Sequence, residues 1–179
     1  MPTTTVNVNT IAGDTTSFNV NAATILSRAS DGDTGTTFAN NVGNVSLTFG
    51  LQDITDLDGL PAGATLNSIR PVVFAQTGGK GTANFSMEIL NSDGEVQGDS
   101  SDASSSEAEQ AEFLGSEVNI SSFTSDQFNG LLLRYTTTDN TLVVASRIFA
   151  TLDYSGAAGN GLIKHTSGFL KLRQGKITL

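Results

Sequence analysis

The stretch TANFSMEIL, residues 82–90, alternates apolar and polar side chains. Its alternating apolar members are Ala83, Phe85, Met87 and Ile89. Successive side chains of a strand point to opposite faces, so the pattern predicts a strand with one face in a core and the other in water. No apolar pattern with the helical period of 3.6 extends over three turns of the chain. The sequence therefore favours strands over helices.

Further short apolar runs are bounded by Gly, Asn and Asp. They are LNSIRPVVFAQ (66–76), TFANNVGNVSLTFGLQ (37–52), GLLLRYTTT (130–138) and NTLVVASRIFATLDY (140–154). Pro71 interrupts the first run and suits an edge strand or a bulge better than a central position. TGGKG (77–81) and Asp139-Asn140 predict the turns of two hairpins. Together these signals predict an all-β sandwich or barrel.

The segments outside these runs have a different composition. Residues 1–35 are rich in Thr, Asn and Gly with isolated apolar residues, which predicts an extended N-terminal arm that adds edge strands or contacts a neighbour. Residues 93–117 hold eight acidic residues and no basic one, which predicts a long solvated loop with at most one turn of helix. The predicted organisation is an arm (1–35), a β-sandwich domain (36–155) and a C-terminal tail (156–179).

Charge is divided unevenly along the chain. All 18 acidic residues lie at or before Asp153, whereas four of the nine basic residues, Lys164, Lys171, Arg173 and Lys176, lie beyond it. An acidic body with few scattered bases argues against nucleic-acid binding and against anionic membranes. The chain has no cysteine, which excludes disulfides and thiolate metal sites. MPTTTVNVNT lacks the pattern of a secretory signal, so we expect a protein made and kept soluble in a host cytoplasm.

The order of these segments resembles β-sandwich proteins of tailed-bacteriophage virions, namely capsid decoration (cement) proteins, head fibres and tail-associated modules. DLDGLPAGATLNSIRPVVFAQ, a glycine loop, NFSMEIL, an acidic segment, FTSDQFNGLLLRYTTTD and RIFATLDYS carry the resemblance, which covers roughly residues 53–155. It implies an antiparallel jelly-roll or immunoglobulin-like sandwich, a homotrimer when it decorates an icosahedral head, and no catalytic residues. The C-terminal glycine repeat is not part of that pattern.

These observations favour a non-enzymatic structural protein on the capsid surface of a virion. We expect a decoration protein that stabilises the head by binding across neighbouring subunits of the major capsid protein, without a cofactor. The alternative is a tail- or head-fibre component that binds a host surface glycan or protein. Copy number separates the two, because a decoration protein is present in more copies per particle than a fibre.

Enzymatic chemistry has few candidate residues. A histidine-dependent hydrolase would have to use His165, the single histidine, which lies in the basic tail beyond the last acidic residue. A surface polar residue is the simpler interpretation of His165. Paired carboxylates could serve glycoside hydrolysis, but the chain has no tryptophan and two tyrosines on which a sugar could stack.

Two acidic loops are candidates for calcium. Asp31 and Asp33 lie in DGDTG, and Asp53, Asp56 and Asp58 lie in DITDLDG. Asp at alternate positions followed by Gly can present several oxygen ligands, although the spacing is not that of an EF-hand. Asp, Asn and Gly are also ordinary turn residues, so solvated turns are the favoured interpretation.

The tail contains glycines at seven-residue intervals, Gly161, Gly168 and Gly175. Each would weaken a helix by about 1 kcal/mol, so short strands LIKH, FLKL and KITL separated by glycine turns explain the pattern better than a coiled coil. We expect this tail to pair with the body's own sheet, with a symmetry mate or with the capsid; the alternative is a disordered tail. The predicted assembly contacts are Ile163, Lys164, Phe169, Leu170, Leu172, Arg173, Ile177 and Leu179.

Overall fold

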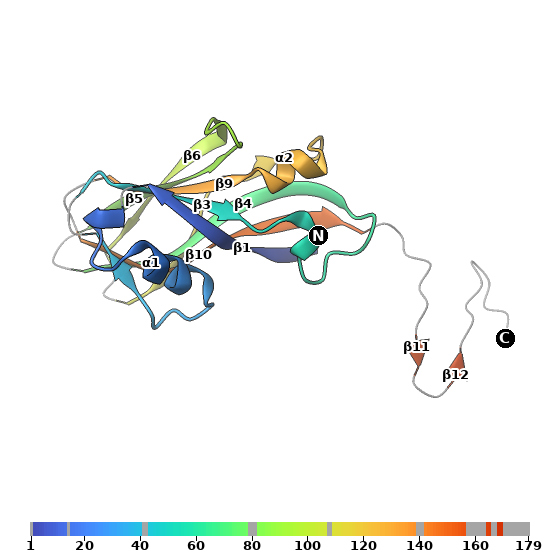
Figure 1. Cartoon of the computed structure of the whole chain (residues 1–179), viewed down its shortest axis with the longest axis horizontal. Helices are drawn as coiled ribbons and strands as arrows, with labels where there is room; N and C mark the ends of the chain where they lie inside the picture. The colour runs from blue at the N-terminus through green and yellow to red at the C-terminus, as the bar shows by residue number, and fades with distance from the viewer. Residues whose placement is uncertain are drawn as a thin grey trace.

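The protein is an antiparallel β-sandwich with a jelly-roll-like arrangement of strands, as the sequence predicts (Figure 1). The computed structural model describes residues 2–13, 15–40, 43–78, 82–106, 109–138 and 142–156, and the backbone of residues 164–165 and 168–169. Among these residues, no helix is long and apolar enough to cross a membrane.

The first sheet, sheet A, is built around two long central strands, β10 (Val143–Ser155) and β4 (Thr65–Thr77). On one side, the first half of β1 (Thr3–Gly13) and the short β2 (Phe38–Ala39) pair with β10. On the other side, β7 (Ala111–Leu114) and β8 (Val118–Asn119) pair with β4. Every one of these pairings is antiparallel.

The second sheet, sheet B, runs from the edge strand β6 to the second half of β1. Its other strands, in order from β6 (Val96–Ser105), are β5 (Ala83–Leu90), β9 (Leu132–Thr137) and β3 (Ser46–Leu51). The strand predicted from TANFSMEIL is β5, and its four alternating apolar side chains are at most 1% exposed.

Strand β1 belongs to both sheets. Thr3–Asn7 pair with β10 in sheet A, and from Val8 onward the strand pairs with β3 in sheet B, with a register shift between Val8 and Thr10. Bulges of this kind let a strand turn the corner between two packed sheets. Gly50 lies opposite the shift, where a Cβ atom would come within 2.2 Å of the Thr10 hydroxyl oxygen. The two sheets are thus joined by one continuous strand.

The predicted N-terminal arm therefore lies within the sandwich. Val6 and Val8 of β1 are 0% and 3% exposed, and Ile25 of helix α1 (Ala22–Ser30) is fully buried. The helix packs beside β1 and β10 (Figure 1). Its amide N-cap, Asn21, accepts a hydrogen bond from the Thr24 backbone N–H at 3.0 Å. Nine residues make fewer than three turns, which explains why the sequence shows no sustained helical pattern.

Three shorter elements complete the sandwich. They are the 3-10 turns η1 (Thr15–Ser17) and η2 (Ile54–Asp56) and the helix α2 (Ser125–Asn129). The α2 helix begins at a capping box in which the Thr124 and Gln127 side chains each bind the other residue's backbone N–H. Phe128 anchors this helix in the core with no exposed surface.

Both predicted hairpins are wrong. The strands on either side of TGGKG are β4 in sheet A and β5 in sheet B, and those on either side of Asp139-Asn140 are β9 in sheet B and β10 in sheet A. Each link therefore crosses from one sheet to the other. Gly, Asn and Asp allow the chain to reverse direction, but they do not determine whether the next strand pairs with its predecessor or packs opposite it.

The predicted acidic loop at residues 93–117 is also wrong in part, because it contains strands β6 and β7. A hairpin joins β5 to β6, and its turn is held by the Asn91 side-chain oxygen, which accepts hydrogen bonds from the backbone N–H groups of Asp93 and Glu95 at 3.0 and 2.9 Å. Ser and Asp have low strand propensity, but pairing with a buried neighbour decides the conformation of an edge strand.

Pro71 lies in the interior of sheet A rather than at its edge. Its carbonyl oxygen accepts a hydrogen bond from the Gly115 N–H at 2.8 Å, so the nitrogen of the same residue faces the same side. On that side, Pro71 lies in the gap between the end of β7 and the start of β8. No strand carbonyl is opposite its nitrogen there, so the missing N–H breaks no hydrogen bond of the sheet. Gly115 is required there, since a Cβ atom would lie 2.5 Å from the Pro71 ring.

Tyr135 of β9 gives the fold a predictable sensitivity to alkali. The side chain is 1% exposed, and burial raises the pKa of its phenol well above the ordinary value of about 10. The folded state therefore favours the neutral phenol. The stability that this preference contributes is fully present below about pH 10 and is lost as the pH rises above it. We expect the free energy of unfolding to fall by about 1.4 kcal/mol more per pH unit above pH 10 than in the Tyr135→Phe variant.

Urea unfolding of both proteins between pH 9 and 11.5 measures this difference, since all other titrating groups are shared. Parallel stability curves for wild type and Tyr135→Phe would contradict the prediction.

Candidate functional site

The outer face of sheet A carries side chains that the core does not use. The ladder register aligns Asn7, Phe149, Val72 and Leu114 in one row across β1, β10, β4 and β7. Two residues further along β10, a second row contains Thr5, Thr151 and Arg70. Because the side-chain period of a strand is two, these rows share one face, and that face holds two distinct surfaces.

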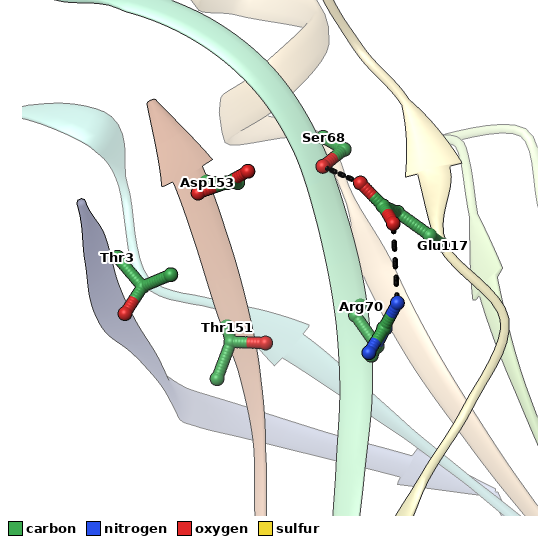
Figure 2. Close-up of a pocket in the computed structure, with 6 residues that line it drawn as sticks. All are labelled: Thr3, Ser68, Arg70, Glu117, Thr151 and Asp153. Atoms are coloured by element: carbon green, nitrogen blue, oxygen red, sulfur yellow. Dashed lines mark hydrogen bonds and ion pairs between the residues drawn. The ribbon is translucent and has the colours of Figure 1, made fainter. Parts of the chain in front are cut away.

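The first surface is a polar recess of about 270 Å³ (Figure 2). We call it the polar recess; it is lined by Thr3, Ser68, Arg70, Glu117, Thr151 and Asp153. The two central strands supply four of these residues, and β1 and the segment between β7 and β8 supply one each.

Glu117 organises one side of the polar recess. One carboxylate oxygen is 3.1 Å from an Arg70 guanidinium nitrogen, and the other accepts a hydrogen bond from the Ser68 hydroxyl (Figure 2). The side chains of Arg70 and Glu117 are 37% and 52% exposed, so the ion pair contributes at most about 1 kcal/mol to stability. Its main effect is to hold a donor and an acceptor in place beside Asp153 and the Thr151 hydroxyl. Such a recess suits a ligand with several hydroxyl groups.

The second surface is an apolar stripe, formed by Val72, Phe74, Leu114 and Phe149. The Phe74 and Phe149 rings stack at 6.4 Å with 21° between their planes, and the Arg147 guanidinium lies 4.2 Å from the centre of the Phe149 ring. Val72 and Phe149 are nearly fully covered although they lie outside the core cluster. Leu114 is 56% exposed at the β7 end of the apolar stripe.

The outer face of sheet B is different in chemistry. Its alternating positions on β3, β5 and β9 are mainly polar and include the hydroxyl-bearing Ser46, Thr48, Ser86 and Thr136. The Ser46 and Thr136 hydroxyls lie 2.8 Å apart, and Glu88 pairs with Arg134 at 2.6 Å. Apolar residues gather at one end of this face, where Val96 is 40% exposed.

The predicted calcium candidates Asp53 and Asp56 lie at the two ends of one turn, η2, and Asp58 follows it. Asp53 precedes η2, and Asp56 and Asp58 are exposed beyond its start. The backbone carbonyls of Asp56 and Asp58 accept hydrogen bonds from the side chains of Gln52 and Thr4, both at 2.8 Å. Across the described ranges, no group of three or more His, Asp or Glu side chains is arranged to hold a metal ion.

The second acidic loop is a turn closed by its own side chains. Asp31 accepts hydrogen bonds from the Asp33 backbone N–H at 2.8 Å and from the Thr36 hydroxyl at 2.6 Å. Asp33 accepts in turn from the Gly35 backbone N–H at 2.8 Å. This is the solvated turn that the sequence favours, because the oxygens are used by neighbouring backbone groups.

In the tail, the structure describes one pairing. Strand β11 (Lys164–His165), within the predicted LIKH strand, is antiparallel to β12 (Gly168–Phe169), which combines a glycine predicted to lie in a turn with the first residue of FLKL. The side chains of Lys164, His165 and Phe169 lie outside the described residues. So do the remaining predicted contacts, Ile163, Leu170, Leu172, Arg173, Ile177 and Leu179.

The polar recess and the apolar stripe were not predicted from the sequence. The run PVVF is apolar on both faces of β4, which is equally compatible with a strand buried on both sides. A signal does exist in Arg147, Phe149, Thr151 and Asp153, which alternate with buried residues along β10 and so mark an outward face.

The chain is similar to several solved structures but matches no sequence family. No protein-family model matches the sequence, and no curated protein matches it. Among solved structures, the carbohydrate-binding module CBM32 of AlyQ in complex with 4,5-unsaturated mannuronic acid is similar with a TM-score of 0.48 and 12% identity, over 82% of this chain and 96% of that one.

Two other similar structures are xylanase modules. The CBM36-1 domain of a multidomain xylanase from the hindgut metagenome of Trinervitermes trinervoides has a TM-score of 0.41 and 12% identity, over 87% of this chain and 98% of that one. The CBM22-1–GH10 modules of Clostridium thermocellum xylanase 10B, complexed with xylohexaose, have a TM-score of 0.45 and 14% identity, over 89% of this chain and 31% of that one. At these TM-scores the likenesses carry no argument about function.

Proposed function

We propose that the chain is a non-enzymatic structural protein of a tailed-bacteriophage virion, a decoration protein that binds across subunits of the major capsid protein as a homotrimer. The observation that supports this proposal best is the apolar stripe. Its accessible part is the Phe74 ring, which stacks on Phe149, and the exposed Leu114, whereas the centre of the opposite face is mainly polar. A sandwich with two unlike faces can place one on a protein surface and the other in water.

The chemistry of the apolar stripe suits a protein partner. Aromatic residues and arginine are enriched in protein interfaces relative to the rest of a protein surface. The cation–π contact fixes Arg147 over the Phe149 ring, so a charged group lies ready beside the anchors. Decoration copies bound across neighbouring capsid subunits would stabilise the assembled shell by mass action.

Substitution of Leu114 by serine tests the proposal. Leu114 is 56% exposed, so the free protein should fold normally when it is replaced. Burial of the leucine side chain against a capsid subunit would contribute up to roughly 1.5–3 kcal/mol to binding. We expect Leu114→Ser to bind particles roughly 10- to 100-fold more weakly. Val96→Ser is the matched control, because Val96 is an exposed apolar residue on sheet B.

Binding is measured by co-sedimentation with particles purified from a virus that lacks the gene for this chain. Roughly hundreds of bound copies per particle are expected from the symmetry of an icosahedral shell. Absence of the protein from wild-type particles, or equal binding by both variants, would overturn the proposal.

The second candidate is a tail- or head-fibre component that binds a host surface glycan. The polar recess favours it, because the Arg70–Glu117 pair, Asp153 and the Thr151 hydroxyl together offer several donors and acceptors. In the same study, purified host polysaccharide replaces the particles. Polysaccharide binding that is lost in Arg70→Ala and kept in Leu114→Ser, together with copies in the tens per particle, would favour this alternative over a decoration protein.

A further inference from the structure

Sheet B ends in a strand with a free side. Among the described strands, β6 pairs with β5 alone, and its residues 101–104 lie in regular register with residues 84–87 of β5. The backbone N–H and C=O groups on the other side of this run face no described strand. Free edges of this kind accept a further strand through main-chain hydrogen bonds.

The side chains of this edge divide between the two faces of the sheet. Ala103 pairs with the buried Phe85 on the inner face, while Asp102 and Ser104 pair with Ser86 and Asn84 on the outer face. A hollow of about 470 Å³ lies beside the run. It is lined by Asn84, Phe85, Asp102, Ala103, Ser104 and Thr138. An added strand would thus meet the Ala103 methyl group on one face and the Asp102 carboxylate on the other.

Charge restricts which strand can bind. Asp99 and Asp102 of β6 are exposed, Glu95 precedes the strand, and the sequence holds no basic residue from 81 to 133. Two β6 edges brought together would place like charges opposite each other, which disfavours edge-to-edge pairing of this strand with itself. A basic strand has no such penalty.

The sequence of the tail meets these requirements. In FLKLR, residues 169–173, Leu170 and Leu172 alternate with Lys171 and Arg173, and the backbone of Phe169 is already extended in β12. A strand of this sequence presents leucines to one face and cations to the other. The cations would lie beside Asp102 when the leucines lie beside Ala103 and the hollow.

We propose that residues 169–173 of a second copy add as a strand to the edge of β6 at residues 101–104. The contact is head-to-tail, since the tail of one copy meets the edge of the next. Such contacts close into a ring when the rotation between copies permits. A ring of three copies would be the trimer of the proposed function. Only this number of copies rests on the proposed function; the strand addition itself does not.

Charge reversal tests the contact on the full-length protein without particles. We expect Asp102→Lys to raise the dissociation constant of self-association at least 10-fold, measured by sedimentation velocity, because it places cations against Lys171 and Arg173. Asp126→Lys is the control, an exposed acid at helix α2. The combination of Asp102→Lys with Lys171→Asp and Arg173→Asp should restore association, which loss of folding could not do.

Cross-linking then identifies the partner segments, since the chain has no cysteine of its own. A mixture of Ser104→Cys and Arg173→Cys proteins should form disulfide-linked dimers that neither protein forms alone. A wild-type chain that stays monomeric, equal effects of Asp102→Lys and Asp126→Lys, or cross-links within a single doubly substituted chain would each overturn the proposal. If Asp102→Lys associated normally while Leu114→Ser lost particle binding, the strand addition would be wrong and the proposed decoration function would still be supported.

Discussion

Removal of residues 2–13 is expected to abolish folding. These residues contain all of β1, which pairs with β10 and with β3 and buries Val6 and Val8. Burial of two valines contributes roughly 3–6 kcal/mol, and each ladder hydrogen bond about 1 kcal/mol. The sum is comparable with the whole stability of a typical domain, about 5–15 kcal/mol. Circular dichroism and urea unfolding should therefore show no cooperative transition.

Removal of residues 159–179 is the matched truncation. We expect it to leave a sandwich that unfolds cooperatively, while self-association is weakened. A chain without residues 2–13 that kept a cooperative transition would mean that β1 is dispensable, as a separate arm would be.

Substitution of Phe85 by alanine is expected to have the largest effect of any single change in the core. Phe85 of β5 is fully buried and contacts Phe113 edge-on at 5.1 Å and Tyr135 at 5.7 Å, measured between ring centres. Truncation of a buried phenylalanine costs about 3–5 kcal/mol, because the transfer free energy is lost and a cavity remains. Urea unfolding of Phe85→Ala should show a midpoint at a lower urea concentration, shifted in proportion to this loss of stability.

Phe74→Ala is the control for this change. Phe74 lies on the outer face of sheet A and is partly exposed, so its truncation removes contacts without opening a core cavity. We expect a loss of about 1 kcal/mol. Equal losses in the two variants would contradict the assignment of Phe85 to the centre of the core.

The alternating segments were predictable because burial imposes a period of two on a strand. TANFSMEIL and SLTFGL became β5 and β3, with their apolar positions inside. Which strands pair was less predictable, since the links at residues 79–81 and 139–141 cross between sheets. Turn residues report a change of direction, whereas partner choice depends on contacts between residues far apart in the sequence. The serine-rich β6 was missed because its neighbour β5, rather than its own composition, makes it a strand.

The candidate sites, too, were predictable where they depend on local sequence and were missed where they depend on contacts between distant residues. Local turn chemistry was readable at Asp31 and Asp33, whose oxygens bind backbone groups within a few residues. The polar recess combines Thr3, Arg70, Glu117 and Asp153 from four separate segments, and no local pattern brings these together. The tail contacts stay predictions, to be tested by the charge reversals above.

The pairing of Thr3 with Asp153 also limits when the protein can form during its synthesis. Sheet A cannot be completed until β10 has been made, because Thr3–Asn7 and β4 both pair with it. Contacts of such large sequence separation fold slowly, and the ribosome adds about 5–20 residues per second. The nascent chain must therefore stay unfolded and soluble until β10 has emerged, and its high content of Asp, Ser, Thr and Asn suits that interval.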